Sequence, residues 1–105
     1  MQFLDHAVRG IAHCWLDADL KGEPLHVHIT EVAPGHRSHP PHQHGGLEGV
    51  YMIEGEGTLE IDGVAQVLRA NEATVFDPRK LHGLVNHSRA PMRYLVILTQ
   101  DAPGS

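Results

Sequence analysis

TLEIDGVAQVL, residues 58–68, predicts a β-hairpin. Its two arms, residues 58–61 and 64–68, have a composition that suits strands. Asp62-Gly63 between the arms readily supplies the two positive φ angles of a type I′ turn. The hairpin makes β-structure the starting point for interpreting the rest of the chain.

Short runs of the same kind extend in both directions from this hairpin. Turn residues separate the runs, and no stretch of a dozen residues shows helical periodicity. Short strand-like segments bounded by Gly, Pro, Asn and Asp are typical of an all-β sandwich or barrel. We predict strands at residues 25–32, 47–53, 73–76, 83–85 and 93–100, and a further strand around Ile11, Cys14, Trp15 and Leu16.

The length of 105 residues predicts one domain, residues 1–105, with a core over about 10–100 and a loose tail at 101–105. A single cysteine excludes an internal disulfide and favours a reducing compartment. The N-terminus lacks the pattern of a secretory signal, and the longest apolar run, residues 94–98, is far too short to cross a bilayer. We therefore expect a soluble, cytoplasmic protein that does not contact membranes.

The charge of the chain argues against nucleic acid as the main partner. The formal net charge is −5, and the eight Lys and Arg residues are scattered. Phosphate binding needs a clustered positive surface. No segment has the pattern of a helix-turn-helix, so we do not expect a transcription factor. A small-molecule partner is the prediction that remains.

Ten histidines are the clear oddity of the composition, and histidine is the commonest metal ligand in proteins. The segment PPHQHGGLE, residues 40–48, holds the most informative of them. In an extended chain His42 and His44 share a face and can converge on one ion. Glu48 follows after a Gly-Gly pair that lets the backbone bend. His82 can complete the set if its strand is a neighbour of this segment.

These residues resemble the first conserved motif of the cupins. In that motif two histidines flank one residue, Glu follows after three more, and Gly after a further six. His42, His44, Glu48 and Gly55 match this spacing. The glycine that usually opens the motif is one residue out of register, at Gly35, and His36 occupies its place.

The second cupin motif is matched in part. Its final histidine and asparagine fall on His82 and Asn86, whereas Asn71, Asp77 and Arg79 stand where the motif has Gly, Pro and Gly. Asn71 is a mild change because asparagine tolerates left-handed turns. Asp77 and Arg79 flank a proline, so we expect a turn of altered geometry there.

The cupin resemblance implies a fold, a cofactor and an assembly. The implied fold is a single-domain cupin-type β-barrel, which is a jelly-roll-like double-stranded β-helix. The implied cofactor is one divalent transition metal per chain (Fe, Mn, Ni, Co or Zn), held by His42, His44, Glu48 and His82. Barrels of this kind commonly pair through an edge strand, so we also expect a homodimer.

Strand periodicity predicts the walls of a pocket around the metal. If Glu48 points inward, Val50 and Met52 do so as well, and His82 brings Leu84 and Asn86 to the same side. The resulting pocket is largely apolar, as ligand pockets usually are. Tyr51 falls in the opposite phase, so we place it outside the barrel.

The other histidines allow two interpretations. His26 and His28 alternate with the apolar residues of segment 25–32, and we favour the apolar face in the core and these histidines toward solvent or a partner subunit. The alternative places His28 in the pocket. His36 and His39 are interpreted as solvated, with gating of the pocket mouth as the alternative. Cys14 is interpreted as a small buried apolar residue.

Two classes of function fit these observations. The first is a metal-dependent enzyme acting on a small oxygenated substrate, either a dioxygenase or an isomerase, lyase or decarboxylase on a sugar acid or keto acid. The complete ligand set favours it. The second is a non-catalytic cupin that binds or senses a small molecule, and the lack of an evident acid-base partner favours that class. One fold hosts many activities, so the fold does not decide between them.

Overall fold

The computed structural model describes residues 1–6, 11, 13–22 and 25–99. Within these ranges the chain is all-β, and the single helical element is a short 3-10 turn, η1 (Ala18–Leu20). No described helix is long and apolar enough to span a membrane. The strands are β1 (Phe3–His6), β2 (Cys14–Asp17), β3 (Leu25–Val32), β4 (Glu48–Glu54), β5 (Glu56–Ile61), β6 (Val64–Arg69), β7 (Ala73–Phe76), β8 (His82–Val85) and β9 (Met92–Thr99).

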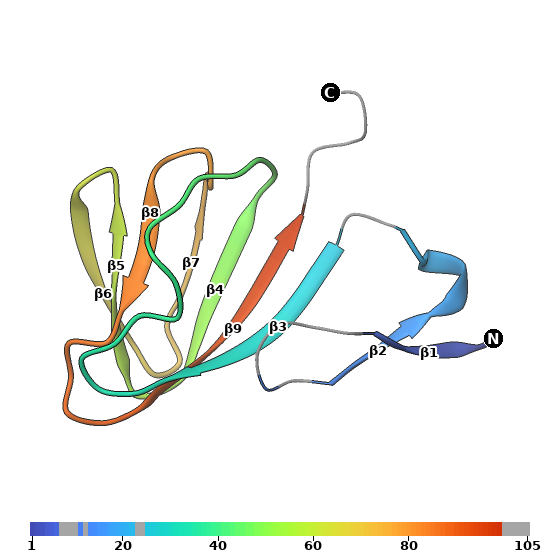
Figure 1. The fold of residues 1–105 in the computed structure, drawn as a ribbon, viewed down its shortest axis with the longest axis horizontal. Helices are drawn as coiled ribbons and strands as arrows, with labels where there is room; N and C mark the ends of the chain where they lie inside the picture. The colour runs from blue at the N-terminus through green and yellow to red at the C-terminus, as the bar shows by residue number, and fades with distance from the viewer. Residues whose placement is uncertain (7–10, 12, 23–24, 100–105) are drawn as a thin grey trace.

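The strands form two main sheets and a separate hairpin (Figure 1). One sheet has four strands in the order β3-β9-β4-β7, and the other has three in the order β6-β5-β8. Every strand pair is antiparallel. The loop from β3 to β4 passes across β8 and touches it at two isolated bridges, Arg37 with Val85 and His42 with His82.

Most predicted strands are observed within one or two residues of their expected ends. The 58–68 hairpin is confirmed, and Asp62 and Gly63 have φ angles of 49° and 80°, as a type I′ turn requires. Asn71 has a φ of 69°, the left-handed conformation expected of it. The predicted N-terminal strand is β2, with Ile11 outside it, and β1 was not predicted. Gln100 and the tail at 101–105 lie outside the described residues.

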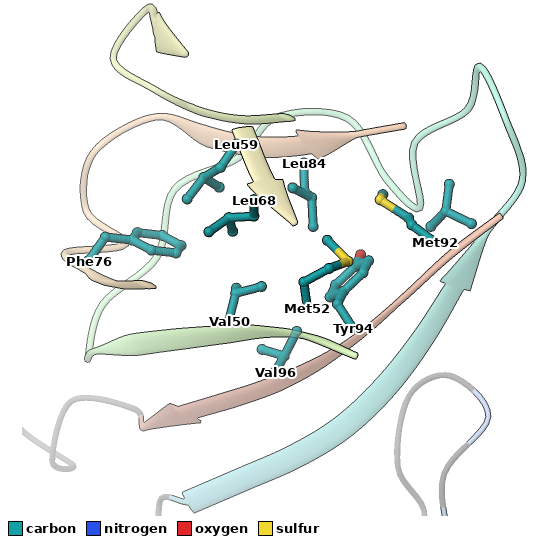
Figure 2. Close-up of a cluster of buried hydrophobic side chains, with 10 residues drawn as sticks. Val50, Met52, Leu59, Leu68, Phe76, Leu84, Met92, Tyr94 and Val96 are labelled. Carbon is teal, nitrogen blue, oxygen red and sulfur yellow. The ribbon is translucent and has the colours of Figure 1, made fainter. Parts of the chain in front are cut away.

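The hydrophobic core fills the space between the two sheets (Figure 2). The four-stranded sheet contributes alternate residues of β4 and β9, and Leu59, Leu68 and Leu84 come from the opposite sheet. The residues from β4 and β9 are Val50, Met52, Met92, Tyr94 and Val96. Alternation explains this pattern, because successive residues of a strand face opposite sides. Tyr51 has the opposite phase, lies outside this core as predicted, and donates a hydrogen bond to Asn71 Oδ1 at 2.7 Å.

The favoured orientation of β3 was wrong. Leu25 is 57% exposed, and neither Val27 nor Ile29 belongs to the core. His28 pairs with Val96, and Thr30 pairs with Tyr94. Both partners are buried, so the polar face of β3 points inward. His28 and Thr30 on the inner face of this strand line a pocket, and the more apolar face of the strand is the outer one.

Gly55 connects β4 to β5 with a φ of 83°. A Cβ built at this position would lie 2.5 Å from the carbonyl oxygen of Pro91 and 3.0 Å from the Cα of Met92. These are backbone atoms and cannot move aside cheaply. Gly63 has nearly the same φ, 80°, but nothing lies within 4 Å of a Cβ built there.

We predict that Gly55→Ala lowers the free energy of unfolding by about 2–5 kcal/mol, which combines left-handed strain with overpacking. The matched control Gly63→Ala carries only the strain and is expected to cost about 1–2 kcal/mol. Urea denaturation of both variants measures the difference. Equal losses would show that the close approach to Pro91 contributes nothing.

Candidate metal centre

The backbone brings the two histidine segments together. His42 N–H donates to His82 O at 2.9 Å, and His82 N–H donates to His42 O at 3.0 Å. His44 N–H donates to Pro78 O at 2.9 Å. The contact therefore continues from His42 to His44 on one segment and from His82 back to Pro78 on the other. The sequence predicted that His82 joins the site if its strand neighbours the segment of His42. That neighbour is the loop that carries His42, and not strand β4.

Three imidazole rings converge as a result. The ring centroids of His42, His44 and His82 are 4.7–5.1 Å apart. One ring nitrogen from each histidine lies within 4.8 Å of the other two. These three residues, which come from two segments far apart in the sequence, could hold a metal ion.

Glu48 joins this group from the first position of β4. Its Oε1 atom lies 2.9 Å from His44 Nε2 and 3.5 Å from His82 Nε2. The carboxylate is almost completely buried. All four predicted ligands are therefore brought together, with Glu48 as the negatively charged member.

Hydrogen bonds orient two of the imidazoles. His44 Nδ1 lies 3.0 Å from Gly45 O, and His82 Nδ1 lies 2.8 Å from Lys80 O. A carbonyl oxygen only accepts, so each Nδ1 carries the hydrogen, and each Nε2 of a neutral ring presents its lone pair. Metal-binding histidines are usually held in this way.

The donor set fits a cation. Among the described residues, His82 Nε2 is a buried atom without a hydrogen-bond partner. It faces Glu48 Oε1 at 3.5 Å, and His44 Nε2 lies at hydrogen-bond distance, 2.9 Å, from the same oxygen. A cation among these atoms would give His82 Nε2 the partner that it lacks. Two imidazole nitrogens and a carboxylate oxygen are ligand types that divalent transition metals accept.

The turn before His82 is stabilised by hydrogen bonds of Asp77 and Arg79, two of the residues that depart from the second cupin motif. Arg79 N–H donates to Asp77 Oδ1 at 3.0 Å, and this bond lowers the pKa of the Asp77 carboxyl below its usual value. Gln43 donates from its side chain to Arg79 O at 2.9 Å, and Arg79 Nη1 donates to Gly46 O at 3.2 Å. The residues that depart from the second cupin motif thus bind the turn to the first motif.

The hairpin turn at Asp62 supports the other side of His82. Asp62 N–H donates to Leu81 O at 2.8 Å, and Leu81 N–H donates to Asp62 Oδ1 at 3.0 Å. Ile61 pairs with His82 in the ladder between β5 and β8. His82 therefore starts its strand between two backbone attachments, one to His42 and one to this turn.

A pocket opens beside the four residues. Of the predicted pocket residues, Val50, Leu84 and His28 line it. The apolar wall is extended by Leu59, Val96 and Leu98. The structure therefore places His28 beside the cavity, on the side of its alternative interpretation, and not toward solvent.

Three predicted pocket residues do not line the pocket. Met52 is 0% exposed and belongs to the core. Asn86 is 0% exposed and is used structurally, because its amide donates to Val32 O at 3.1 Å and to Ala90 O at 2.8 Å. His36 is exposed, and its Nδ1 donates to Pro34 O at 2.8 Å.

His39 lines the pocket, which fits its alternative interpretation as a residue of the pocket mouth, and its ring lies 4.2 Å from that of His42. Sequence reasoning missed Thr30, Ser38 and Tyr94, which line the pocket and each carry a hydroxyl group. The phase of Val96 and Tyr94 in the apolar run at 94–98 was a signal for the inward face of β9. Cys14, predicted to be buried, is partly exposed.

We predict that adding zinc, which is diamagnetic, leaves His44 and His82 with hydrogen on Nδ1 and shifts their Nε2 resonances, because Nδ1 is committed to a carbonyl. Long-range proton–nitrogen NMR of the imidazoles measures both nitrogens. His36 serves as the control, since its Nδ1 is bonded in the same way but its ring lies outside the site. Hydrogen on Nε2 of His82 in the zinc-loaded protein would contradict the assignment.

Comparison with known proteins identifies relatives of this fold. The family model described as "Cupin domain" matches residues 28–98, which include all four candidate ligands. The search of curated proteins finds no match.

Solved structures that resemble this chain are also cupins. The Cupin_2 domain of an XRE family transcriptional regulator from Enterobacter cloacae is 29% identical, with a TM-score of 0.68, and the match covers 82% of this chain and 88% of that one. A sugar phosphate isomerase of the cupin superfamily from Silicibacter pomeroyi is 26% identical, with a TM-score of 0.68, over 79% of this chain and 55% of that one.

A cupin protein from Bacteroides fragilis covers the whole chain. It is 21% identical, with a TM-score of 0.72, and the match spans 100% of this chain and 90% of that one. At this identity the likeness concerns the fold alone. The three structures confirm the jelly-roll fold that the sequence predicted.

Proposed function

We propose that this chain, which belongs to the cupin family, binds one divalent transition metal through His42, His44, Glu48 and His82. We further propose that it uses the metal to act on a small oxygenated substrate. The observation that carries the proposal is the buried Nε2 of His82, which is oriented by Lys80 O, has no hydrogen-bond partner in the described part of the chain and faces Glu48.

Three neutral imidazoles and one carboxylate suit Fe, Mn, Co, Ni or Zn. Such an ion, when bound, polarises a carbonyl or carboxylate oxygen or lowers the pKa of a bound water. The chain's own residues would then select and hold the substrate. Val50, Leu84 and Val96 exclude water from one side, while Glu48 offsets part of the ion's charge.

The pocket supports a small substrate. Its volume is about 50 Å³, and a buried water needs about 10–15 Å³ on this measure. The reacting end of a sugar acid or keto acid is of suitable size and carries the oxygen atoms that a hard cation prefers. The named activity of the Silicibacter relative, a sugar phosphate isomerase, supports the isomerase among the reaction types we consider.

A non-catalytic binding or sensing role is the second candidate. The Enterobacter relative is a domain of a transcriptional regulator, and this chain covers 88% of that structure. A cupin attached to a regulator can report a small molecule without converting it. The same pocket would serve either role, so turnover has to be measured.

We expect close to one metal ion per wild-type chain and loss of most of it in His42→Ala, because one of three imidazoles is removed. His36→Ala is the matched control, since His36 lies six residues away, is exposed and does not line the pocket. Elemental analysis of untagged protein measures the content. Retention of the ion by His42→Ala, or equal loss in His36→Ala, would overturn the ligand assignment.

We expect the metal-loaded protein to convert at least one member of a panel of hydroxy acids, keto acids, diketones and catechols, and Glu48→Gln to lose that activity at least tenfold. Product analysis by NMR covers isomerase, lyase and decarboxylase reactions. Oxygen uptake by the iron form covers a dioxygenase. Binding of panel members without any turnover would favour the sensing role.

The homodimer and the cytoplasmic location are further proposals. β3 lies at the edge of the four-stranded sheet, and the outer face of that sheet exposes Ile97 (44%) and Val75 (77%). The free cysteine agrees with a reducing compartment.

We expect light scattering to give twice the mass of one chain, and Ile97→Lys to shift the protein toward the monomer because the charge would be buried in the interface. Val64→Lys is the control, since Val64 is 71% exposed but lies in the opposite sheet. A monomeric wild type would contradict the proposal.

A further inference from the structure

The pocket has a polar group that the metal chemistry does not use. Thr30 from β3, Ser38 from the loop before β4, and Tyr94 from β9 all line the cavity. Tyr94 OH and Ser38 Oγ are 2.9 Å apart and share a hydrogen bond. We call Thr30, Ser38 and Tyr94 the hydroxyl cluster.

The sheet register places the hydroxyl cluster away from the candidate ligands. Glu48 lies opposite Leu98, whereas Tyr94 lies opposite Met52 and Thr30. The two rows are separated by four residues of β4, which corresponds to a backbone distance of about 13 Å at about 3.3 Å per residue. Between the rows, Val50 pairs with Val96, and both line the pocket. His28 lies opposite Val96 in the same row and also lines the pocket. The cavity thus has two polar ends, and the row between them holds two valines and His28.

Burying the Tyr94 hydroxyl costs free energy unless the hydroxyl forms hydrogen bonds. The side chain is 4% exposed, and it packs in the core beside Met52 and Val96. Phenylalanine would fill the same space without burying a polar atom. The Tyr94 hydroxyl instead reaches the cavity, where it meets Ser38. Hydroxyl groups both donate and accept, so this pair can exchange its shared bond for bonds to a ligand hydroxyl.

The charges around the pocket argue against a ligand whose far end is a phosphate. Among the described residues that line it there is no Lys or Arg, and its basic side chains are histidines. Arg37 approaches from behind Gly83, but its guanidinium is paired with Glu60 at 2.6 Å. The described chain also offers no α-helix whose N-terminus could bind phosphate. A phosphate dianion at the hydroxyl cluster would therefore lack the Lys or Arg partners that usually bind it.

We propose that the hydroxyl cluster recognises an uncharged hydroxyl group at the far end of the substrate, whose other end meets the metal ligands. The substrate class is accordingly a hydroxylated acid without phosphate. This inference rests on the proposed function, because it takes the metal site as the point where the acid end binds. It sets this chain apart from a protein that acts on sugar phosphates.

Three probes test this recognition: erythronate, its analogue without the terminal hydroxyl, and its ester with phosphate on that hydroxyl. Calorimetric titration of cobalt-loaded wild-type protein measures each affinity. We expect erythronate to bind about five- to tenfold more tightly than the deoxy analogue, the gain expected of one hydrogen bond. The phosphate ester should bind more weakly than either.

Two variants separate recognition from support of the loop. Tyr94→Phe and Ser38→Ala should remove the preference for erythronate and leave the affinity for the deoxy analogue unchanged. A hydroxyl pair that only anchored the loop would weaken both probes equally. Tyr51→Phe is the matched control, because its hydroxyl bonds Asn71 outside the core and its loss should leave the preference intact.

Several results would overturn the inference: equal affinities of wild type for erythronate and the deoxy analogue, tighter binding of the phosphate ester, no binding of any probe, or equal weakening of both probes in Tyr94→Phe. Metal content is measured on every sample. Full metal content with equal affinities would overturn the hydroxyl cluster alone, whereas a preference for the hydroxyl in a protein that holds no metal would overturn the metal site alone.

Discussion

Two backbone hydrogen bonds between His42 and His82 support everything else in the site. They join the loop before β4 to the start of β8, which belongs to the other sheet. The bond from His44 N–H to Pro78 O continues the same attachment. Because these bonds involve only backbone atoms, the backbone positions of His42 and His82 are set before any side chain or ion contributes. The candidate metal centre is in this sense a product of sheet architecture.

Local patterns predicted the fold well because they depend on near neighbours. Asp62-Gly63 needed only a type I′ turn, and Asn71 needed only a left-handed residue. The motif around His42 and Glu48 predicted which residues would meet, since motif spacing encodes a geometry that related chains share. Even the degraded motif before His82 retained its position, because Asp77 and Arg79 supply a replacement turn.

The errors arose where the orientation depends on long-range pairing. The alternation in β3 indicated two faces correctly, but the apolar face was assigned to the core. Only the pairing of His28 with Val96 shows which face is inner, and no local signal contains that information. Met52 and Asn86 had the right phase but are fully buried and do not line the cavity, since periodicity gives direction and not depth. Tyr94 was overlooked because it resembled an ordinary core residue.

The turn at Asp62 has a consequence for how this barrel can be altered. Its conformation is one that several dipeptides can adopt, so a hairpin tip of this kind is normally an interchangeable part. Here the Asp62 carboxylate also accepts the backbone hydrogen of Leu81, next to His82. Grafting a Gly-Gly tip would preserve the hairpin and still release one attachment of β8. The loop and the metal centre are therefore not separable modules, and a segment swap at the tip would also perturb the position of His82.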